Sequence, residues 1–364
     1  MNMDERNYYL AFSLINGIGP KTFALLLKHF KSANKAWFVS SEDLKKAGLS
    51  ERLISKFEKV RNELDIKKYP EKLKQKKVSF IALCDKEYPK ILSQIPNPPI
   101  VLYVKGDISK VDFEKTLGIV GTRKITSYGR EVTKLFSFDL ASSGFTIVSG
   151  LAMGVDAQAA MSAIEANGKT IAVMGNGVDL CFPTSNENLY DKILDGNGII
   201  VSEFPLGMSP TAGSFPSRNR IIAGLSLGVL VTEGAEDSGS LITADYAFKF
   251  NRKVFAVPGP ITSSLSVAPL KLIEKGAKLV TSAEDINKNF KFKILNFKSM
   301  PKTLNVQQLT REELKIAQLL KHEGLSFDEI VRRIKTNSSN LAVTLSMMEI
   351  KGIIKNLGGK YCLN

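Results

Sequence analysis

The segment Phe215-Pro216-Ser217-Arg218-Asn219-Arg220 carries the densest set of groups that could do chemistry in this sequence. Two guanidinium groups flank an amide there, immediately before a helical pattern that starts at Asn219. Arginine side chains and the free amides of a helix start both bind phosphates, and a phenylalanine ring can stack on a base. The segment therefore predicts contacts to a phosphodiester chain. The alternative is an ion pair of an arginine with Glu203 or Glu233, because both arginines cannot follow one helix face.

The residues Gly121-Thr122-Arg123-Lys124 form a second candidate phosphate site, directly after the apolar run Leu117–Val120. A glycine lets a ligand approach the backbone closely, and an arginine offers a forked donor that suits phosphate. In open α/β sheets, ligands bind where the parallel strands end. The GxGxxG pattern and a suitably placed acidic residue for a ribose are both missing, which argues against a dinucleotide site.

Three other turns place small or basic residues where a phosphate could bind. Ser149-Gly150-Leu151-Ala152 ends the next predicted strand, and Ser238-Gly239-Ser240 opens a predicted helix. Near the N-terminus, Gly17, Gly19 and Lys21 lie in a turn that resembles a helix-hairpin-helix, whose exposed amides can hold a phosphate. Ordinary turn chemistry is the alternative for each of these segments.

Catalytic and metal-binding patterns are absent from the sequence. The two histidines, His29 and His322, lie in the flanking helical regions, which excludes a Ser-His-Asp or Cys-His arrangement in the central region. The Walker A pattern is missing, and the three scattered cysteines form no zinc or disulfide pattern. The acidic residues Asp156, Asp179 and Glu233 are expected to cap helices or to pair with cations. We therefore predict no catalytic residue, no metal and no cofactor.

Charge is distributed unevenly along the 364 residues. Residues 1–80 contain 17 Lys/Arg and 9 Asp/Glu, residues 286–364 contain 14 and 6, and residues 81–285 contain 19 and 21. The net charge of +14 favours an anionic partner, although a solvated lysine-rich surface would give the same total. Since the middle of the chain is slightly acidic, an anion site there has to be a local patch.

The composition is that of a globular protein, with 44% apolar and 24% charged residues. No apolar run approaches the ~18 residues of a membrane span. The first residues lack the charged-then-apolar layout of a secretory signal. We therefore expect a cytoplasmic protein with no membrane partner.

Short apolar runs alternate with helical patterns through the middle of the chain, which predicts an α/β fold with a Rossmann-like, doubly wound, mostly parallel sheet. The expected strands are 78–82, 101–105, 116–120, 146–149, 170–173, 198–202, 228–232 and 253–257. The expected helices are 127–142, 155–167, 186–194, 219–226, 240–250 and 265–275.

The flanking regions predict two additional modules. Residues 1–77 show helical periodicity and predict an all-α N-terminal domain, followed by the sheet domain at 78–285. Residues 286–308 are polar and predict a linker. Three helical patterns and a small hairpin in 309–364 predict a winged helix.

Taken together, the segments resemble the DprA/Smf family, the DNA-processing protein A of natural transformation. The resemblance covers roughly residues 85–285. Its carrying residues are Gly118–Arg123, Ser149–Ala152, Thr170–Gly175, Phe215–Ser226, Ser238–Ala244 and Val254–Gly259. It is specific because of the joint order and spacing of these segments.

The resemblance implies an extended Rossmann domain that binds single-stranded DNA, forms a homodimer and helps to load the RecA recombinase onto incoming strands, without catalysis. It further implies that the loops matching Gly121–Arg123, Ser149–Ala152 and Phe215–Arg220 form a basic phosphate pocket. The family's Tyr-Pro-x-x-Asn pattern appears here as Phe182-Pro183-Thr184-Ser185-Asn186, which adds Asn186 to the candidate DNA contacts.

The chain departs from the family pattern at three places. The stretch around Gln158 lacks the usual histidine, Thr184 stands where a basic residue would strengthen DNA contact, and Ser266–Pro269 replaces a Gly-x-Asn. Two alternatives to the single-strand-binding prediction remain. One is a Rossmann-like nucleotide phosphoribohydrolase, although its Pro-Gly-Gly-x-Gly-Thr motif is replaced by Ser238–Thr243. The other is a regulator that binds double-stranded DNA through the winged helix, whose third helix has few basic residues.

Overall fold

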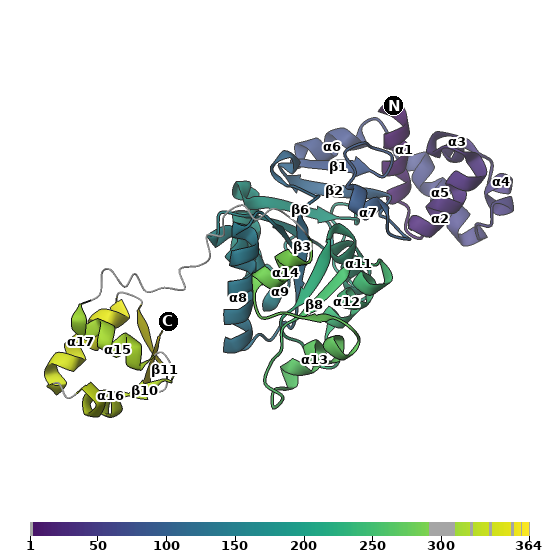
Figure 1. Cartoon of the computed structure of the whole chain (residues 1–364). Coiled ribbons are helices and arrows are strands. Elements are labelled where there is room, and N and C mark those ends of the chain that lie inside the picture. The colour runs from purple at the N-terminus through teal and green to yellow at the C-terminus, as the bar shows by residue number, and fades with distance from the viewer. Residues whose placement is uncertain are drawn as a thin grey trace. The chain divides into compact units, whose positions relative to one another are not determined.

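The computed structural model describes residues 3–290, 310–320, 323–334, 337–350, 353–357 and 359–363 (Figure 1). The chain forms two compact units, Met1–Ser299 and Met300–Asn364. No helix among the described residues is long and apolar enough to cross a membrane.

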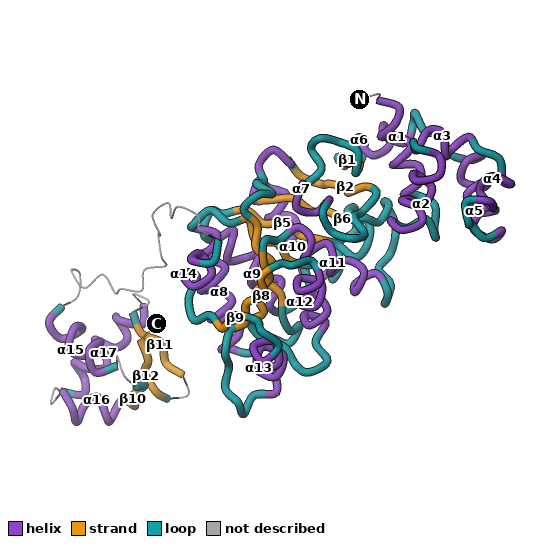
Figure 2. The backbone as a smooth tube through the Cα atoms, turned by 45° about the vertical axis from the view of Figure 1, so that its right-hand side comes forward, coloured by secondary structure: helices purple, strands orange, loops and turns teal. Residues whose placement is uncertain are grey.

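Within the described residues, the first unit contains a nine-stranded sheet of order β1-β2-β6-β5-β4-β3-β7-β8-β9. From β6 to β9 all neighbouring strands are parallel, while β1 and β2 add an antiparallel edge beside β6. The strands, drawn in orange in Figure 2, are β1 Val78–Ala82, β2 Val101–Gly106, β3 Thr116–Val120, β4 Thr146–Ser149, β5 Lys169–Val173, β6 Gly198–Ser202, β7 Gly228–Val231, β8 Lys253–Ala256 and β9 Lys278–Leu279.

Helices cover both faces of the sheet, which explains why every residue of β3, β4, β6 and β7 is buried. Apolar residues of α8, α9 and α14 pack on one face, and those of α7, α11, α12 and α13 pack on the other. These helices and the shorter turns between them are α7 Lys90–Ser93, α8 Ser127–Ser142, α9 Val155–Glu165, α10 Glu187–Lys192, α11 Ser214–Leu225, α12 Gly239–Lys249, α13 Val267–Glu274, α14 Ala283–Lys288, η1 Ile108–Lys110, η2 Thr184–Asn186, η3 Ile193–Asn197 and η4 Ser264–Ser266.

The N-terminal helices share a core with the sheet. One cluster of buried residues runs from Phe12, Phe23 and Trp37 to Tyr103 on β2. At the surface of this contact, Arg6 forms an ion pair with Asp85 at 3.0 Å. The helices are α1 Met3–Ser13, α2 Pro20–Phe30, α3 Ala33–Phe38, α4 Ser41–Lys46, α5 Glu51–Glu63 and α6 Tyr69–Gln75. Hydrophobic packing therefore continues across the predicted boundary at residue 77, which stays a prediction.

The second unit consists of a three-helix cluster and a small antiparallel sheet of order β10-β12-β11 among its described residues. Its elements are α15 Arg311–Leu319, β10 Leu325–Ser326, α16 Phe327–Ile334, α17 Ser338–Ile350, β11 Ile354–Leu357 and β12 Lys360–Leu363. The winged-helix prediction is confirmed. The third strand, β10, was not predicted because two residues are too short to show alternation.

The doubly wound, mostly parallel sheet is also confirmed, with one local error that matters for the site. The helix predicted from Asn219 begins at Ser214 instead, so Phe215 to Arg218 lie in its first turns. Pro216 misled the prediction, yet proline is compatible with a first helical turn, where its missing N–H has no partner to lose. In the predicted linker 286–308, residues 286–288 belong to α14, and 291–308 lie outside the described residues.

Candidate nucleic-acid interface

The carboxyl ends of β3 and β7 lie side by side at the point where the strand order reverses. The Thr122 amide donates to the Glu233 carbonyl at 2.8 Å, which joins the two loops. A Cβ at Gly121 would lie 2.6 Å from that same carbonyl oxygen, so this position requires glycine. Such a reversal is where open α/β sheets leave a crevice for ligands.

Buried carboxylates hold the loops at these strand ends. Glu233 accepts hydrogen bonds from the Thr126 amide at 3.0 Å and from its hydroxyl at 2.5 Å. Asp156 accepts one from the Gly150 amide at 2.9 Å. Burial raises the pKa of Asp156, against the opposing effect of the Arg218 charge. The sequence predicted that these acids cap helices or pair with cations, whereas in the structure both accept hydrogen bonds from loop residues and fix the loop geometry.

The loop after β4 is tied to its neighbours on both sides. The Ser149 hydroxyl donates to the Ile119 carbonyl at 2.8 Å, and Asn186 Nδ2 donates to the Leu151 carbonyl at 2.9 Å. Ala152 is half-buried at the end of this loop. The Ser149 hydroxyl and the Asn186 side-chain amide are therefore bonded to backbone carbonyls of the protein. They hold the loop after β4 in place at the strand ends.

Arg218 lies under the loop rather than in solvent. Only 4% of its surface is exposed, and its Nη1 donates to the carbonyls of Gly150, at 2.6 Å, and of Val173. Burial lowers the pKa of Arg218 to about 10, and Asp156 partly offsets that effect. Arg218 thus links the ends of β4 and β5 to α11.

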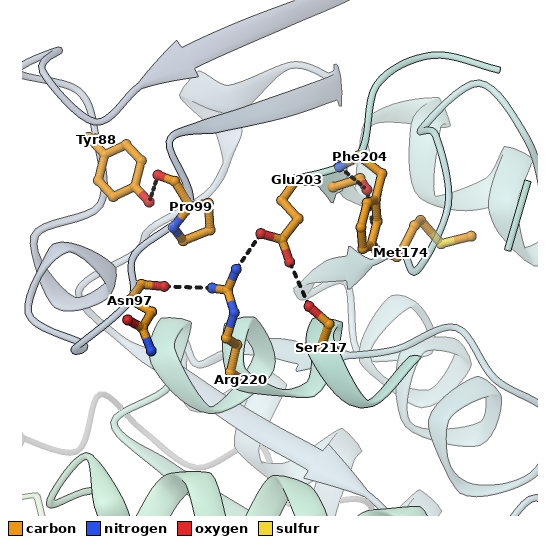
Figure 3. Close-up of polar contacts among 9 residues, drawn as sticks. Tyr88, Asn97, Pro99, Met174, Glu203, Phe204, Ser217 and Arg220 are labelled. Atoms are coloured by element: carbon orange, nitrogen blue, oxygen red, sulfur yellow. Dashed lines mark hydrogen bonds and ion pairs between the residues drawn. The ribbon is translucent and has the colours of Figure 1, made fainter. Parts of the chain in front are cut away.

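Arg220 lies on the other side of α11, away from Arg218. It forms an ion pair with Glu203, and its Nη1 donates to the Asn97 carbonyl at 2.8 Å (Figure 3). Glu203 also accepts from the Ser217 hydroxyl at 3.2 Å. Of the two interpretations open at the sequence level for Arg220, the geometry matches the ion pair with Glu203.

The start of α12 lies beside the start of α11. Ser238 caps this helix by accepting from the Ser240 amide, and Asn219 Nδ2 donates to the Gly239 carbonyl at 3.2 Å. Gly239 is exposed and Ser240 is buried. This contact brings Ser238–Ser240 beside α11, which a shared role of the two segments in binding DNA requires.

The exposed rim of these loops carries cations and aromatic rings. Arg123 and Lys124 are exposed, and the Arg123 guanidinium lies 5.5 Å from the centroid of the Phe215 ring. The Phe215 ring in turn lies 5.7 Å from that of Phe182, whose residue surface is 42% exposed. We call these loops and their rim, made of Gly121–Lys124, Ser149–Ala152, Phe182, Phe215, Arg218, Asn219 and Ser238–Ser240, the strand-end site.

Phe182 is the member of this site that sequence reasoning missed. It was noted only as the aromatic residue of the Phe182–Asn186 pattern. That pattern was the available signal, since an aromatic residue at its first position is a candidate for base stacking. The predicted N-terminal contacts are exposed, Gly17 and Gly19 in the turn before α2 and Lys21 in the first turn of α2, and they lie outside the strand-end site.

The three places that depart from the family pattern lie outside the strand-end site. Gln158 accepts from Arg130 at 3.4 Å and donates to the Ser162 hydroxyl at 2.9 Å. Thr184 is exposed in η2, and Ser266 is buried against Gly259. In the part of the chain that the structure describes, no group of His, Cys, Asp and Glu is arranged to hold a metal.

Comparison with known proteins gives two family matches along the chain. Residues 79–291 match the family of the DNA recombination-mediator protein A, and residues 300–360 match the DprA winged helix domain. Protein Smf of Synechocystis is 41% identical over 290 residues, which cover 79% of this chain and 73% of that protein. The DNA processing protein DprA of Bacillus subtilis is 43% identical over 209 residues, 57% of this chain and 70% of its own.

Two solved structures agree with these matches. The DNA processing protein A of Streptococcus pneumoniae superposes with a TM-score of 0.68 at 33% identity, covering 79% of this chain and 99% of that one. That of Helicobacter pylori, studied for its mode of binding single-stranded DNA, gives a TM-score of 0.53 at 31% identity, covering 58% and 94%. The chain belongs to the DprA/Smf family of DNA-processing proteins.

Proposed function

We propose that this protein binds single-stranded DNA at the strand-end site and does not act on it as an enzyme. The observation that carries the proposal is the row formed by Arg123, Phe215 and Phe182 along the rim. A cation beside two partly exposed rings fits a strand that presents phosphates and unstacked bases together. The Helicobacter pylori relative, which binds single-stranded DNA, supports the same ligand.

The phosphates are expected to meet the exposed Arg123 and Lys124 first, with the small residues of the loops allowing close approach. Arg218 and Arg220 have protein partners in this structure. We therefore assign Arg218 a positioning role, and Arg220 a role in holding α11 against the loop that follows β6.

Membership of the family further leads us to infer a homodimer that acts in the cytoplasm, loads RecA onto single strands and serves natural transformation or recombination. These roles require that a bound strand be handed on rather than cleaved.

A nucleoside monophosphate incubated with the protein should release no free base. Release of the base would instead favour the phosphoribohydrolase alternative.

Arg123→Ala is expected to weaken binding of a single-stranded oligonucleotide about 10- to 100-fold, since a hydrogen bond to a charged group contributes about 1.5–3 kcal/mol. Fluorescence anisotropy over a salt series measures this affinity. Wild type should prefer single to double strands. The slope of log affinity against log salt should be about 0.7 smaller in the variant, for one lost phosphate contact.

The matched control is Lys253→Ala. Lys253 is an exposed cation at the start of β8, on the edge of the sheet opposite the strand ends. Its variant loses the same formal charge and should bind like wild type. Equal affinity of Arg123→Ala and wild type would refute the proposed site.

Phe182→Ala should weaken binding of the same oligonucleotide about 5- to 100-fold, because stacking of a base on an aromatic side chain contributes about 1–3 kcal/mol. An oligonucleotide with abasic sugars should bind the variant and wild type alike, since it has no ring to stack. Phe38→Ala, which removes an exposed ring from α3, is the control. An equal loss with abasic DNA would show that Phe182 acts without stacking.

A further inference from the structure

A second concave surface lies beside the strand-end site, between the helical N-terminal part of the first unit and its sheet. This cleft has a volume of about 830 Å³ and is bounded by the turn before α2 and the loop after β6. Its lining includes Asn16, Lys21, Asn97, Phe204, Ser217 and Tyr246. Ligand sites of proteins commonly measure about 300–1,000 Å³, so the cleft is large enough for parts of a nucleic-acid chain.

One helix separates this cleft from the strand-end site. Successive residues of an α-helix are about 100° apart, so Phe215 and Asn219 share one face of α11 while Ser217 and Arg220 share the opposite face. The first pair belongs to the strand-end site, and the second pair, which Figure 3 labels, lines the cleft. The two sites are therefore one helix diameter apart, about 10 Å.

The charges in the cleft do not oppose a polyanion. Glu203 lines the wall, but its carboxylate is paired with Arg220 and accepts from Ser217. Lys21, at the opposite wall, is exposed and forms no salt bridge within the described part of the chain. The N-terminal 80 residues that supply this wall carry the net charge of +8 counted above. The cleft thus presents a cation on one side and a neutralised acid on the other.

Groups that suit bases line the same surface. Phe204 and Tyr246 are both partly exposed there, and rings of this kind stack on bases of any sequence. Asn16 and Asn97 add amide side chains that can donate to or accept from a base edge. Aromatic rings interleaved with a cation and amides are the chemistry of a site for single-stranded nucleic acid.

We propose that a single strand held at the strand-end site continues over the start of α11 into this cleft, where Lys21 contacts a phosphate and bases lie against Phe204 and Tyr246. The inference rests on the proposed function, because it extends the path of the same ligand. It also gives the turn containing Gly17, Gly19 and Lys21 a place in DNA binding. The length of strand that the protein covers therefore depends on both sites.

Two oligonucleotide lengths separate the sites. A strand of about 2 nucleotides is shorter than the about 10 Å between the sites and can fill only one of them, whereas a strand of about 16 can reach both. Lys21→Glu in the full-length chain should weaken binding of the long strand about tenfold, lower its salt slope by about 0.7 and leave the short strand unchanged. Lys28→Glu, the same charge change further along α2 and outside the cleft, should bind both lengths like wild type.

Gly19→Trp provides an independent test by filling the cleft. Gly19 has a φ of −88°, and a Cβ there meets no atom within 4 Å, so a side chain can be added at this position, which lines the cleft. Gly19→Trp too should weaken binding of the long strand alone, whereas Ala24→Trp, on α2 outside the cleft, should not weaken it. Unfolding curves that match wild type would show that both variants fold.

The outcomes distinguish the two proposals. If Lys21→Glu and Gly19→Trp bind the long strand like wild type while Arg123→Ala does not, the cleft proposal is wrong and the strand-end site stands. If Lys21→Glu weakens both lengths, or Lys28→Glu has the same effect, the cleft is again refuted. If Arg123→Ala changes neither length, the proposed function itself fails.

Discussion

Replacing Arg220 by methionine is expected to destabilise the protein by about 3–5 kcal/mol, because it leaves the Glu203 carboxylate buried without its partner. The side chains of the two residues are only 10% and 12% exposed. Arg220 also satisfies the Asn97 carbonyl at 2.8 Å. The loss should appear in urea unfolding followed by the fluorescence of Trp37, the single tryptophan, which is buried in the core shared with the sheet.

Two further variants identify the cause of this loss. Adding Glu203→Gln to Arg220→Met should recover part of the stability, since no charge is then left unpaired. Lys271→Met breaks an exposed ion pair, in which the side chain of Lys271 is 50% exposed and that of Glu236 is 74% exposed. It should change stability by at most about 1 kcal/mol. If Arg220→Met and Lys271→Met lose equally little stability, the Arg220–Glu203 pair does not support the fold.

The pH dependence gives the same test another readout. Burial raises the pKa of Glu203 above its ordinary value, and Arg220 opposes that rise. Without Arg220 the folded-state pKa rises further, so the folded state holds its proton more tightly than the unfolded state. Stability then falls as the pH rises through the folded-state pKa. The deficit of Arg220→Met should therefore be smaller at about pH 5 than at about pH 8.

Sequence patterns predicted the sheet well because burial on both faces leaves a local signature. The runs at β3 and β6 are continuous apolar segments bounded by turns, and both strands have the predicted bounds. The start of α11 was harder. Its first turns hold Pro216 and polar residues, and their helical state depends on packing against the sheet, which no local pattern shows.

The site was predictable as a set of loops but not as a set of roles. Parallel strands have to end at one edge, so Gly121–Lys124 and Ser149–Ala152 were expected to come together. Which arginine faces solvent is decided by partners distant in sequence, such as Glu203 for Arg220 and Gly150 for Arg218. The row of Phe182, Phe215 and Arg123 joins three separate segments, so only the folded chain reveals it.

Arg218→Gln tests the distinction between positioning and contact most directly. The guanidinium donates to the carbonyls of Gly150 and Val173, and its charge opposes the rise in the pKa of the buried Asp156 carboxyl, so its loss should destabilise the fold by about 3–5 kcal/mol. Adding Asp156→Asn should restore part of that stability. The deficit should grow with pH, because the folded-state pKa of Asp156, already raised by burial, rises further without Arg218.

The same variant should also bind single-stranded DNA at least about tenfold more weakly, if the loop after β4 keeps its binding arrangement only about a tenth of the time. A residue that only positions the loop leaves the number of phosphate contacts unchanged. The salt slope of Arg218→Gln should therefore equal that of wild type, while Arg123→Ala lowers it by about 0.7. A slope lowered as much as that of Arg123→Ala would mean that Arg218 leaves its carbonyl partners and contacts the strand itself.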